Sequence, residues 1–467
     1  MGKEWTAQDL AEFAGRDWKV EDANAQVTQL KSGGGAVNID RPCTAGDGIF
    51  VLTQEDRAAA EAAGANLLHQ ATTCSNFIPA SGAASRMFAG LRGELAGAVR
   101  EELEKRITEF PFWSDCQRQA LKAVAPSDRV NDGVSWMLDP DSGWSHLPKG
   151  LIPFHRYADG SSQSSFEEHI TEWMKMAGNA PIHFTIPVAH THRIEQLWVG
   201  MGQISTSIQM PETDTLAWDI EAHDVARNTD GSLLFRPGGH GSLLHNLNAL
   251  PGAFITIRNV DNVVPKHRME FRNQEQRILI GHCARLAGER DALLDRADVN
   301  SEHWKAEAKD WLSLFNEDAK DIADPAELMR ELDRPLRVAG MVLNSGAPGG
   351  GPFWIRQADG RSTPSIVEGS ELPEGGLSGG THFNPVDLVC NVQRSDGYRY
   401  PLMDFAQRDR FYTGTKDWNG RKVRIVERPG LWNGGMDGWL TCFVEVPAET
   451  FAPVKTVMDL LDSERMP

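Results

Sequence analysis

The sequence predicts an α/β protein built around a doubly wound, mostly parallel sheet. Strand-like apolar runs alternate with helix-like segments over residues 71–330, which is the pattern of repeated βα units. Small and polar residues follow several of these runs directly, at the positions where open α/β sheets bind ligands. A chain of 467 residues is also longer than one hydrophobic core supports, so two or three domains are expected.

The first predicted domain is a helical cap formed by residues 1–70. A helix is expected over Ala7–Ala14, a turn at the glycines of Gly33–Gly35, and an alanine-rich helix over Glu55–Gln70. We expect this segment to cover the domain that follows it.

Residues 71–330 form the predicted domain with the parallel sheet. The charged stretch Arg285–Arg334 has helical character and is expected to connect this domain to the next. The strands expected in the domain are Asn76–Ala80, His183–Pro187, Ile204–Gln209, Ala253–Asn259 and Arg277–Gly281.

Residues 331–467 are predicted to form a β-rich C-terminal domain. Segments rich in Gly and Pro separate its strands. The expected strands are Leu336–Leu343, Phe353–Gln357, Ser365–Glu368, Leu388–Val392 and Cys442–Val446.

Composition narrows the classes of partner. Lys and Arg total 47 against 65 Asp and Glu, a net charge of -18, which argues against a nucleic-acid partner because binding a phosphate backbone needs a basic surface. The 6 cysteines include no C-x-x-C pair, so they are expected to be reduced packing residues. No apolar run approaches the ~20 residues that span a bilayer, and the first residues do not read as a signal peptide. No membrane partner is predicted, and the cytoplasm is the expected location.

Residues 77–87 are the most informative segment. They read as a strand end followed by a loop of small residues that includes Ser81, Gly82 and Ala83. Such a loop lets backbone N–H groups approach an anionic phosphate chain, and Arg86 would supply a positive charge. The alternative is an ordinary strand-to-helix turn packed with small residues.

Residues 80–87 resemble the A-A-G-x-G-T-R-M signature of sugar-1-phosphate nucleotidylyltransferases. Gly82 stands at the first glycine, Ser85 at the threonine and Arg86 at the arginine, whereas Ala84 replaces the second glycine. The methyl group of Ala84 either displaces a bound triphosphate outward or is accommodated by the site.

Further segments, in the same order along the chain, resemble motifs of the UDP-N-acetylhexosamine pyrophosphorylase branch. Together these short matches cover roughly residues 74–458 and imply a nucleotidyltransferase (GT-A-like) fold for the sheet domain. The whole chain also resembles an uncharacterised bacterial family known only as a domain of unknown function. The segments are Pro148-Lys149-Gly150 (P-K-G), the strand-end Gln209, Arg236–Leu243 (P-x-G-N-G-G-L), Val260-Asp261-Asn262 (V-D-N), Ser365–Leu372 (V-V-E-Y-S-E-I) and Phe451–Lys455 (F-S-P-L-K).

The resemblance implies roles in nucleotidyl transfer for these residues. Mg²⁺ would be the cofactor, with Asp261 and Asn433 as its protein ligands, since Mg²⁺ is usually held by one or two carboxylates plus substrate phosphates. Arg86 and Lys149 would act in catalysis on the leaving phosphates. Lys455 would act on the sugar phosphate or the α-phosphate.

The other predicted contacts are with the nucleotide and the sugar. Glu368 and Asn384 are expected to bind sugar hydroxyls, and Trp432 or Trp439 is a candidate to stack on a sugar face. Ordinary alternatives exist: glycines also form tight turns, lone cations are usually solvated, and an Asp-Asn pair also ends strands. The predicted nucleotide-binding residues are Ser81, Gly82, Ala83, Gln209, Gly238, Gly239 and Gly241.

The predicted function is therefore a nucleotidyltransferase that couples a nucleoside triphosphate to a sugar 1-phosphate and releases pyrophosphate. UTP is favoured by the resemblance. One alternative is a non-enzymatic glycan-binding protein that uses the tryptophan-rich C-terminal region. The other is a metal-dependent hydrolase, although no H-E-x-x-H motif occurs. Its histidines would be drawn from His183, His190, His192, His240, His245 and His382.

Overall fold

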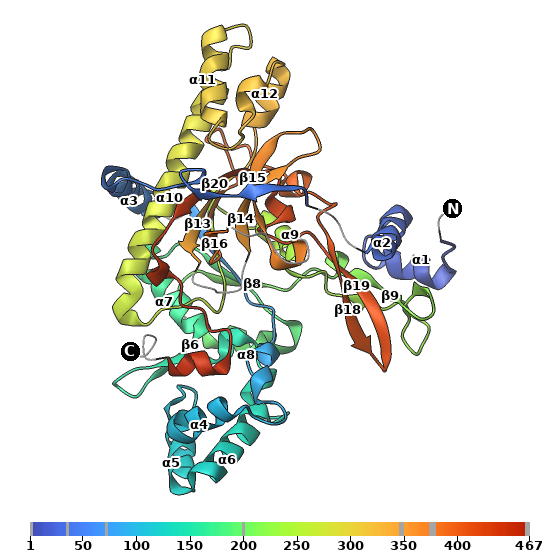
Figure 1. Cartoon of the computed structure of the whole chain (residues 1–467), viewed down its shortest axis with the longest axis vertical. Coiled ribbons are helices and arrows are strands. Elements are labelled where there is room, and N and C mark those ends of the chain that lie inside the picture. The colour runs from blue at the N-terminus through green and yellow to red at the C-terminus, as the bar shows by residue number, and fades with distance from the viewer. Residues whose placement is uncertain are drawn as a thin grey trace.

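The computed structural model describes residues 3–33, 37–70, 73–198, 201–344, 350–372 and 380–462. A central sheet runs through the molecule, and helices and smaller sheets surround it (Figure 1). The strands of the central sheet, in spatial order, are β2 (Thr44–Ala45), β3 (Gly48–Phe50), β20 (Leu440–Glu445), β13 (Leu336–Leu343), β17 (Asp387–Asn391), β12 (Phe254–Arg258), β4 (Cys74–Pro79), β7 (Ile182–Thr185) and β8 (Ile204–Ser207), with β16 (His382–Phe383) paired to β13.

The central sheet is mostly parallel, as predicted. β12, β4, β7 and β8 run parallel to one another, and so do β2, β3, β20 and β13. β17 lies between the two groups and is antiparallel to both of its neighbours. The carboxyl ends of β12, β4 and β7 therefore lie at one edge, where ligands bind in open α/β sheets.

Helices cover both faces of the sheet. Neighbouring residues of a strand point to opposite faces. Ile78 packs in a hydrophobic cluster with α7 (Ser165–Ala177) and α10 (Lys266–Asp295), whereas Phe77 packs in a second cluster with α9 (Leu244–Asn248). The sheet is thus buried on both sides, as a doubly wound fold requires. The helices are α1 (Ala7–Ala14), α2 (Val20–Ser32), α3 (Gln54–Leu68), α4 (Gly97–Arg106), α5 (Asp115–Ala123), α6 (Pro126–Leu138), α7 (Ser165–Ala177), α8 (Thr191–Leu197), α9 (Leu244–Asn248), α10 (Lys266–Asp295), α11 (Glu302–Leu312) and α12 (Pro325–Leu332).

The strand predicted at Arg277–Gly281 is wrong, because these residues lie in the middle of α10. Residues 278–280 are buried, since α10 packs between the sheet and α3. A short apolar run looks the same in a buried helix and in a buried strand. Gly281 permits the contact between the helices, because a Cβ there would lie 1.8 Å from the Ala60 carbonyl oxygen of α3.

The helices of residues 1–70 pack against two different parts of the molecule. The predicted helices are present as α1 and α3. α3 packs along α10, whereas α1 and α2 lie against a smaller sheet (Figure 1). Gly33 ends α2 in the left-handed conformation, as its predicted turn requires, and residues 34–36 lie outside the described residues. The smaller sheet contains β9 (Thr215–Asp219), β10 (Asp224–Val225), β11 (Phe235–Arg236), β18 (Tyr412–Trp418) and β19 (Arg421–Glu427).

The strands predicted in residues 331–467 are present, but they do not form a sheet of their own. β13, β17 and β20 belong to the central sheet. β14 (Gly351–Arg356) and β15 (Ser362–Val367) pair instead with β1 (Ile39–Pro42) in another sheet. A division of the chain at residue 331 therefore does not coincide with a division of the sheets.

The long segment between the predicted phosphate loop and Lys149 is mostly helical. α4, α5 and α6 pack together there, at the bottom of Figure 1. β5 (Pro153–Arg156) and β6 (Ser162–Ser164) form a hairpin that leads into α7. This insertion lies beside the edge of the sheet where β4 ends, because the same hydrophobic cluster includes Ala84 and Met87.

Candidate active site

Four of the sequence motifs meet where β4 and β12 end. The two strands are parallel neighbours, so the Gly82 loop and Asp261 follow strand ends that lie side by side. The Ala84 N–H donates to the Leu147 carbonyl oxygen (3.0 Å), which places the P-K-G segment beside the loop. The C-terminal motif joins them, because the Val454 N–H donates to the Asp261 carbonyl oxygen (3.0 Å). Segments far apart in the sequence thus share one edge of the sheet.

Asp261, Lys149 and Lys455 form the charged centre of this edge, which we call the Asp261 cluster. Asp261 Oδ2 lies 2.9 Å from Lys149 Nζ and 3.7 Å from Lys455 Nζ. The side chains of Lys149 and Asp261 are 16% and 12% exposed, whereas that of Lys455 is 47% exposed. The cluster therefore concentrates two cations at one point of a chain whose net charge is -18.

The other carboxylate oxygen of Asp261 fits a bound cation. Asp261 Oδ1 is buried and has no hydrogen-bond partner among the residues that the structure describes. Such an atom is costly unless a cation or a donor reaches it. Asn433 contacts a different carboxylate, because its Nδ2 donates to Glu371 Oε2 (3.1 Å). Within the described residues it shares no hydrogen bond or ion pair with Asp261. Its role as a second ligand stays a prediction.

Helix α7 holds the backbone before Asp261 through a stripe of polar residues. The Ser165 hydroxyl donates to the Val260 carbonyl oxygen, and His169 Nε2 lies 3.3 Å from the same oxygen. Glu172 Oε2 lies 3.0 Å from Arg258 Nη1 at the end of β12. Burial lowers the pKa of His169 to about 3, so its imidazole is neutral and acts by hydrogen bonding. The motifs did not point to these residues, although their spacing puts them on one helix face.

Gly150 of the P-K-G segment lies directly against a ring of α7. A Cβ at Gly150 would lie 2.4 Å from the Phe166 ring. Phe166 is fully buried and packs edge-on against Phe184 and Trp198, so the surrounding core leaves it little room to move. Glycine therefore allows the close approach that brings the preceding lysine to the Asp261 cluster.

We expect Gly150→Ala to destabilise the protein by about 1–3 kcal/mol, as overpacking of a filled core does. Turnover should fall as well, because the displaced turn carries Lys149 away from Asp261. Urea unfolding measures the first effect, and Gly90→Ala is the control because a Cβ at Gly90 meets open space. Phe166→Leu, added to Gly150→Ala, should restore part of the stability. Wild-type stability of the single variant would contradict the packing argument.

The loop after β4 is open where a ligand would lie. A Cβ at Gly82 would meet no atom within 4 Å. Within the described part of the chain, the backbone N–H groups of Ser81, Gly82 and Ala83 donate no hydrogen bond, and the exposed Arg86 has no ion pair. The methyl group of Ala84, by contrast, is buried in a hydrophobic cluster and does not face the open side. The loop thus offers free donors and a free cation, which phosphate binding requires.

The loop of Gly238, Gly239 and Gly241 is filled by protein. A Cβ at Gly241 would lie 2.0 Å from the Pro429 carbonyl oxygen, and one at Gly238 would lie 2.7 Å from the Thr213 carbonyl oxygen. Gly239 has a φ of 75°, a conformation that favours glycine. Close packing and a turn therefore account for these glycines without a ligand.

A second polar group lies around Arg410, and we call it the Arg410 cluster. The buried Arg410 guanidinium lies 2.9 Å from Glu371 Oε1 and 2.6 Å from Asp437 Oδ1. Glu371 Oε2 accepts hydrogen bonds from the Glu368 backbone N–H (2.9 Å) and from Asn433 Nδ2 (3.1 Å). Two of the predicted site residues are thus joined through one carboxylate.

The predicted sugar contacts lie beside the Arg410 cluster. Glu368 Oε1 lies 3.4 Å from His240 Nε2, and the His240 ring stacks on Trp432. Burial raises the pKa of Glu368, but His240 and Trp432 outweigh burial, so the net pKa lies below its ordinary value. The Asn384 N–H donates to the Gly350 carbonyl oxygen (2.8 Å), and a Cβ at Gly350 would lie 3.5 Å from Glu368 Cγ. Glu368 and Asn384 therefore lie in one neighbourhood.

The histidines of the hydrolase alternative make other contacts. His183 Nδ1 and Nε2 each lie 2.8 Å from a serine hydroxyl, those of Ser205 and Ser207. His382 Nε2 lies 3.0 Å from Glu445 Oε2. In the described ranges no three His, Cys, Asp or Glu side chains come together as a metal site. The described residues thus offer no support for the hydrolase.

We expect His183 to make the fold sensitive to acid. Burial lowers its pKa to about 4 in the folded protein, against about 6.5 in the unfolded chain. The unfolded state therefore binds the proton first, and stability falls as pH decreases from about 6.5 to about 4. At pH 5 this linkage lowers the free energy of unfolding by about 2 kcal/mol relative to pH 8. Urea unfolding at the two pH values should show a smaller loss of stability in His183→Asn than in the wild type. Equal losses in the two proteins would contradict this prediction.

Comparison with known proteins identifies the fold and the family. Among the described residues, no helix is long and apolar enough to cross a lipid bilayer. The chain is similar to the UDP-N-acetylglucosamine pyrophosphorylase of Trypanosoma brucei in complex with an inhibitor, with 12% identity and a TM-score of 0.50 over 94% of this chain and 74% of that one. It is also similar to a mutant UDP-glucose pyrophosphorylase of Leishmania major in complex with UDP-glucose, with 11% identity and a TM-score of 0.48 over 98% and 79% of the two chains.

The first of these likenesses shows that the chain has a fold in common with that pyrophosphorylase. No curated protein matches the chain. A family described as "Domain of unknown function (DUF4301)" matches residues 6–465. The resemblance to an uncharacterised family is thereby confirmed, and the chain belongs to the DUF4301 family.

Proposed function

We propose that the protein is a nucleotidyltransferase that couples a nucleoside triphosphate to a sugar 1-phosphate and releases pyrophosphate. The observation that carries this proposal is the meeting of four motif segments around Asp261. The fold shared with a UDP-N-acetylglucosamine pyrophosphorylase supports it and favours a GT-A-like arrangement. UTP is the proposed nucleotide for the same reason.

In the proposed reaction an oxygen of the sugar phosphate attacks the α-phosphorus, the bond from this phosphorus to the bridging oxygen breaks, and pyrophosphate leaves with the electron pair. The protein has to position both substrates and neutralise their charge. The free N–H groups of residues 81–83, together with Arg86, would hold the leaving phosphates. Lys149 would join them, while the more exposed Lys455 would meet the sugar phosphate or the α-phosphate.

Mg²⁺ is the proposed cofactor, and when bound it would neutralise charge on the phosphate oxygens. Asp261 would hold it through Oδ1, the buried oxygen that has no partner among the described residues. Asn433 is the other proposed ligand, although its contacts in the structure belong to the Arg410 cluster.

The nucleotide base and the sugar have separate proposed contacts. Gln209 follows β8, and its Nε2 is a buried donor without a partner in the described residues, which suits it to a base edge. Asn384 Nδ2 is likewise a buried donor without a partner in the described residues. The Glu368 carboxylate lies in the same neighbourhood and would accept hydrogen bonds from sugar hydroxyls. The backbone of residues 238–241 is the proposed ribose contact, although close packing and a turn account for its glycines in the structure.

Pyrophosphate release tests the proposal directly. The purified chain is incubated with Mg²⁺, each of the four common nucleoside triphosphates and a panel of sugar 1-phosphates. Release is expected only when both substrates are present, with UTP as the best donor. A thermal-shift measurement with the same triphosphates is an independent readout, since a ligand of the native state raises its melting temperature. If no triphosphate raised the melting temperature and no pair released pyrophosphate, the proposal would be wrong.

We expect Lys149→Ala and Lys455→Ala to slow turnover through different substrates. Lys149 is largely buried and lies closer to Asp261, so its loss should weaken triphosphate binding more. The loss of Lys455 should affect sugar phosphate binding or the chemical step more. Each change should reduce the free energy of substrate binding or of transition-state stabilisation by a few kcal/mol at most, about the value of a charged hydrogen bond. Separate titrations of the two substrates distinguish the variants, with the exposed Lys105→Ala as control. Equal effects on both substrates from both variants would contradict the assignment.

A further inference from the structure

A buried group of charged side chains lies close to the Asp261 cluster. Arg258 is the last residue of β12, three residues before Asp261, and its Nη1 lies 3.0 Å from Glu172 Oε2 on α7. The other oxygen of Glu172, Oε1, lies 3.7 Å from Arg272 Nε on α10. The side chains of Arg258, Glu172 and Arg272 are 3%, 2% and 0% exposed. One buried carboxylate thus joins two arginines from different elements, and we call the three residues the Glu172 cluster.

Asp387 brings a second carboxylate to the Glu172 cluster. It is the register partner of Arg258 in the antiparallel pair of β12 and β17, so the two side chains project from the same face of the sheet. Burial raises the pKa of Asp387 to about 6, and the Arg258 guanidinium opposes this rise. Above this pH, two carboxylates meet two guanidinium groups, and the buried charges are balanced.

Stability does not account for the Glu172 cluster. Arg258 Nε and Nη2, Glu172 Oε1 and all three guanidinium nitrogens of Arg272 make no hydrogen bond within the described residues. The free energy of taking charges out of water is recovered only where the remaining polar atoms of an ion pair are bonded as well. Apolar side chains of similar volume are therefore expected to be at least as stable in the same place. The role of the cluster has to come from what it holds in position.

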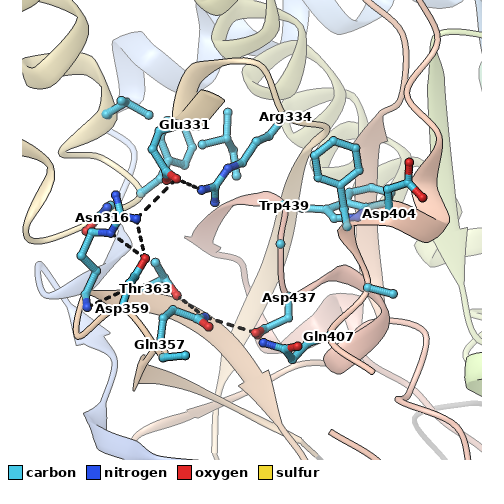
Figure 2. A pocket seen from close by; sticks show the side chains of 18 residues that line it. Asn316, Glu331, Arg334, Gln357, Asp359, Thr363, Asp404, Gln407, Asp437 and Trp439 are labelled. Carbon is cyan, nitrogen blue, oxygen red and sulfur yellow. Dashed lines mark hydrogen bonds and ion pairs between the residues drawn. The ribbon is translucent and has the colours of Figure 1, made fainter. Parts of the chain in front are cut away.

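A similar arrangement elsewhere in the molecule has access to solvent. Glu331 Oε1 pairs with Arg334 and lies 3.6 Å from Arg361, so here too one carboxylate joins two arginines. Figure 2 shows Glu331 and Arg334 at the wall of a cavity of about 440 Å³. The side chains of the two arginines are 23% and 17% exposed, so water can complete their hydrogen bonds. No residue of the Asp261 cluster lines this cavity, so the Glu331 pair is a matched control.

The Glu172 cluster attaches the strand end that carries Asp261 to two helices. Other side chains of α7 contact the Val260 carbonyl oxygen, and Glu172 lies on the same helix face and contacts Arg258. Arg272 joins Glu172 in turn to α10, which packs against the sheet. We propose that Glu172 and Arg258 are positioning residues that hold Asp261 in place for nucleotidyl transfer, an inference that rests on the proposed function.

The experiment replaces the ion pair by two apolar side chains, in the double variant Glu172→Met with Arg258→Met. Arg272 and Asp387 remain, so the buried charges stay balanced. Since such an exchange is often neutral or stabilising, the variant should unfold at the urea concentration of the wild type or at a higher one. Its kcat for pyrophosphate release should fall at least about tenfold, because Asp261 is displaced, while the KM values change less.

Amide hydrogen exchange of residues 258–263 is a second readout, and it does not depend on the proposed function. Exchange should be faster in the double variant, because the strand end has lost one of its attachments. The control, Glu331→Met with Arg334→Met, should change neither kcat nor this exchange. If the wild type releases no pyrophosphate, the proposed function fails, whereas the exchange measurement still decides whether the ion pair holds the segment of Asp261.

Wild-type kcat in a folded double variant, or unchanged exchange of residues 258–263, would overturn the proposal. A loss of stability together with wild-type kcat would assign the ion pair a structural role instead. Arg258→Lys decides the matter where the double variant fails to fold, because lysine keeps the charge beside Glu172 but not the planar fork. This variant should also lower kcat and speed the exchange, and wild-type values of either in the folded protein would overturn the proposal.

Discussion

Asp261→Asn should keep the fold and lower turnover at least a hundredfold, which corresponds to about 2.7 kcal/mol of transition-state stabilisation. The substitution preserves the shape of the side chain but removes the charge that faces Lys149 at 2.9 Å. The same charge would hold Mg²⁺ through the buried Oδ1. Steady-state release of pyrophosphate with saturating substrates measures the loss.

Asp409→Asn is the matched control for this change. Asp409 is exposed, so its substitution should leave turnover unchanged. Urea unfolding of both variants separates a loss of stability from a loss of chemistry. A fall in turnover of less than about tenfold, or ~1.4 kcal/mol, in a folded Asp261→Asn protein would make the metal-ligand role untenable.

Gly82→Val should abolish the binding of Mg-UTP without unfolding the protein. A Cβ at Gly82 meets no atom within 4 Å, and the backbone there is not in the left-handed region, so valine fits the fold. Its side chain would project into the space where the phosphates have to approach the backbone N–H groups. Calorimetric titration of Mg-UTP into wild type and variant measures the effect.

Gly90→Val controls for the general cost of adding a branched side chain to an open glycine. A Cβ at Gly90 also meets no atom within 4 Å, and this residue lies beyond the phosphate loop, so binding should be normal. Ala84→Gly should not tighten binding, because the Ala84 methyl group is buried in the hydrophobic cluster and not on the open side. Undiminished binding by a folded Gly82→Val protein would remove the foundation of the proposed function.

The strand ends that carry the site could be predicted because their signals are local. β4 and β12 are strands of six and five residues whose apolar side chains include Phe77 and Ile78 in β4 and Phe254, Ile255 and Ile257 in β12, and each is followed closely by small or polar residues. Such runs with their flanking turns can be recognised one segment at a time. The same local method failed at residues 277–281, where the apolar run belongs to a helix buried between the sheet and α3. There, burial and not periodicity dominates the pattern.

The supporting residues of the site could not be predicted in this way. Ser165 and His169 matter because α7 lies against the Val260 carbonyl oxygen, a contact between residues 95 and 91 positions apart. Likewise, Gly82 and Gly241 look alike in the sequence, but one borders open space and the other touches the Pro429 backbone. Whether a glycine serves a ligand or a packing contact depends on what lies opposite to it.

Local sequence patterns were sufficient to predict the mostly parallel α/β architecture, the order of the motifs and the resemblance to an uncharacterised family. These properties depend on periodicity, turn chemistry and short spacings, which neighbouring residues set. The meeting of Lys149 and Lys455 at Asp261, and the hydrogen bond from Asn433 to Glu371, could not be read from such patterns, because they depend on how distant segments pack. Such contacts join segments up to hundreds of residues apart, and they exist only once the strands have paired and both faces of the sheet are covered.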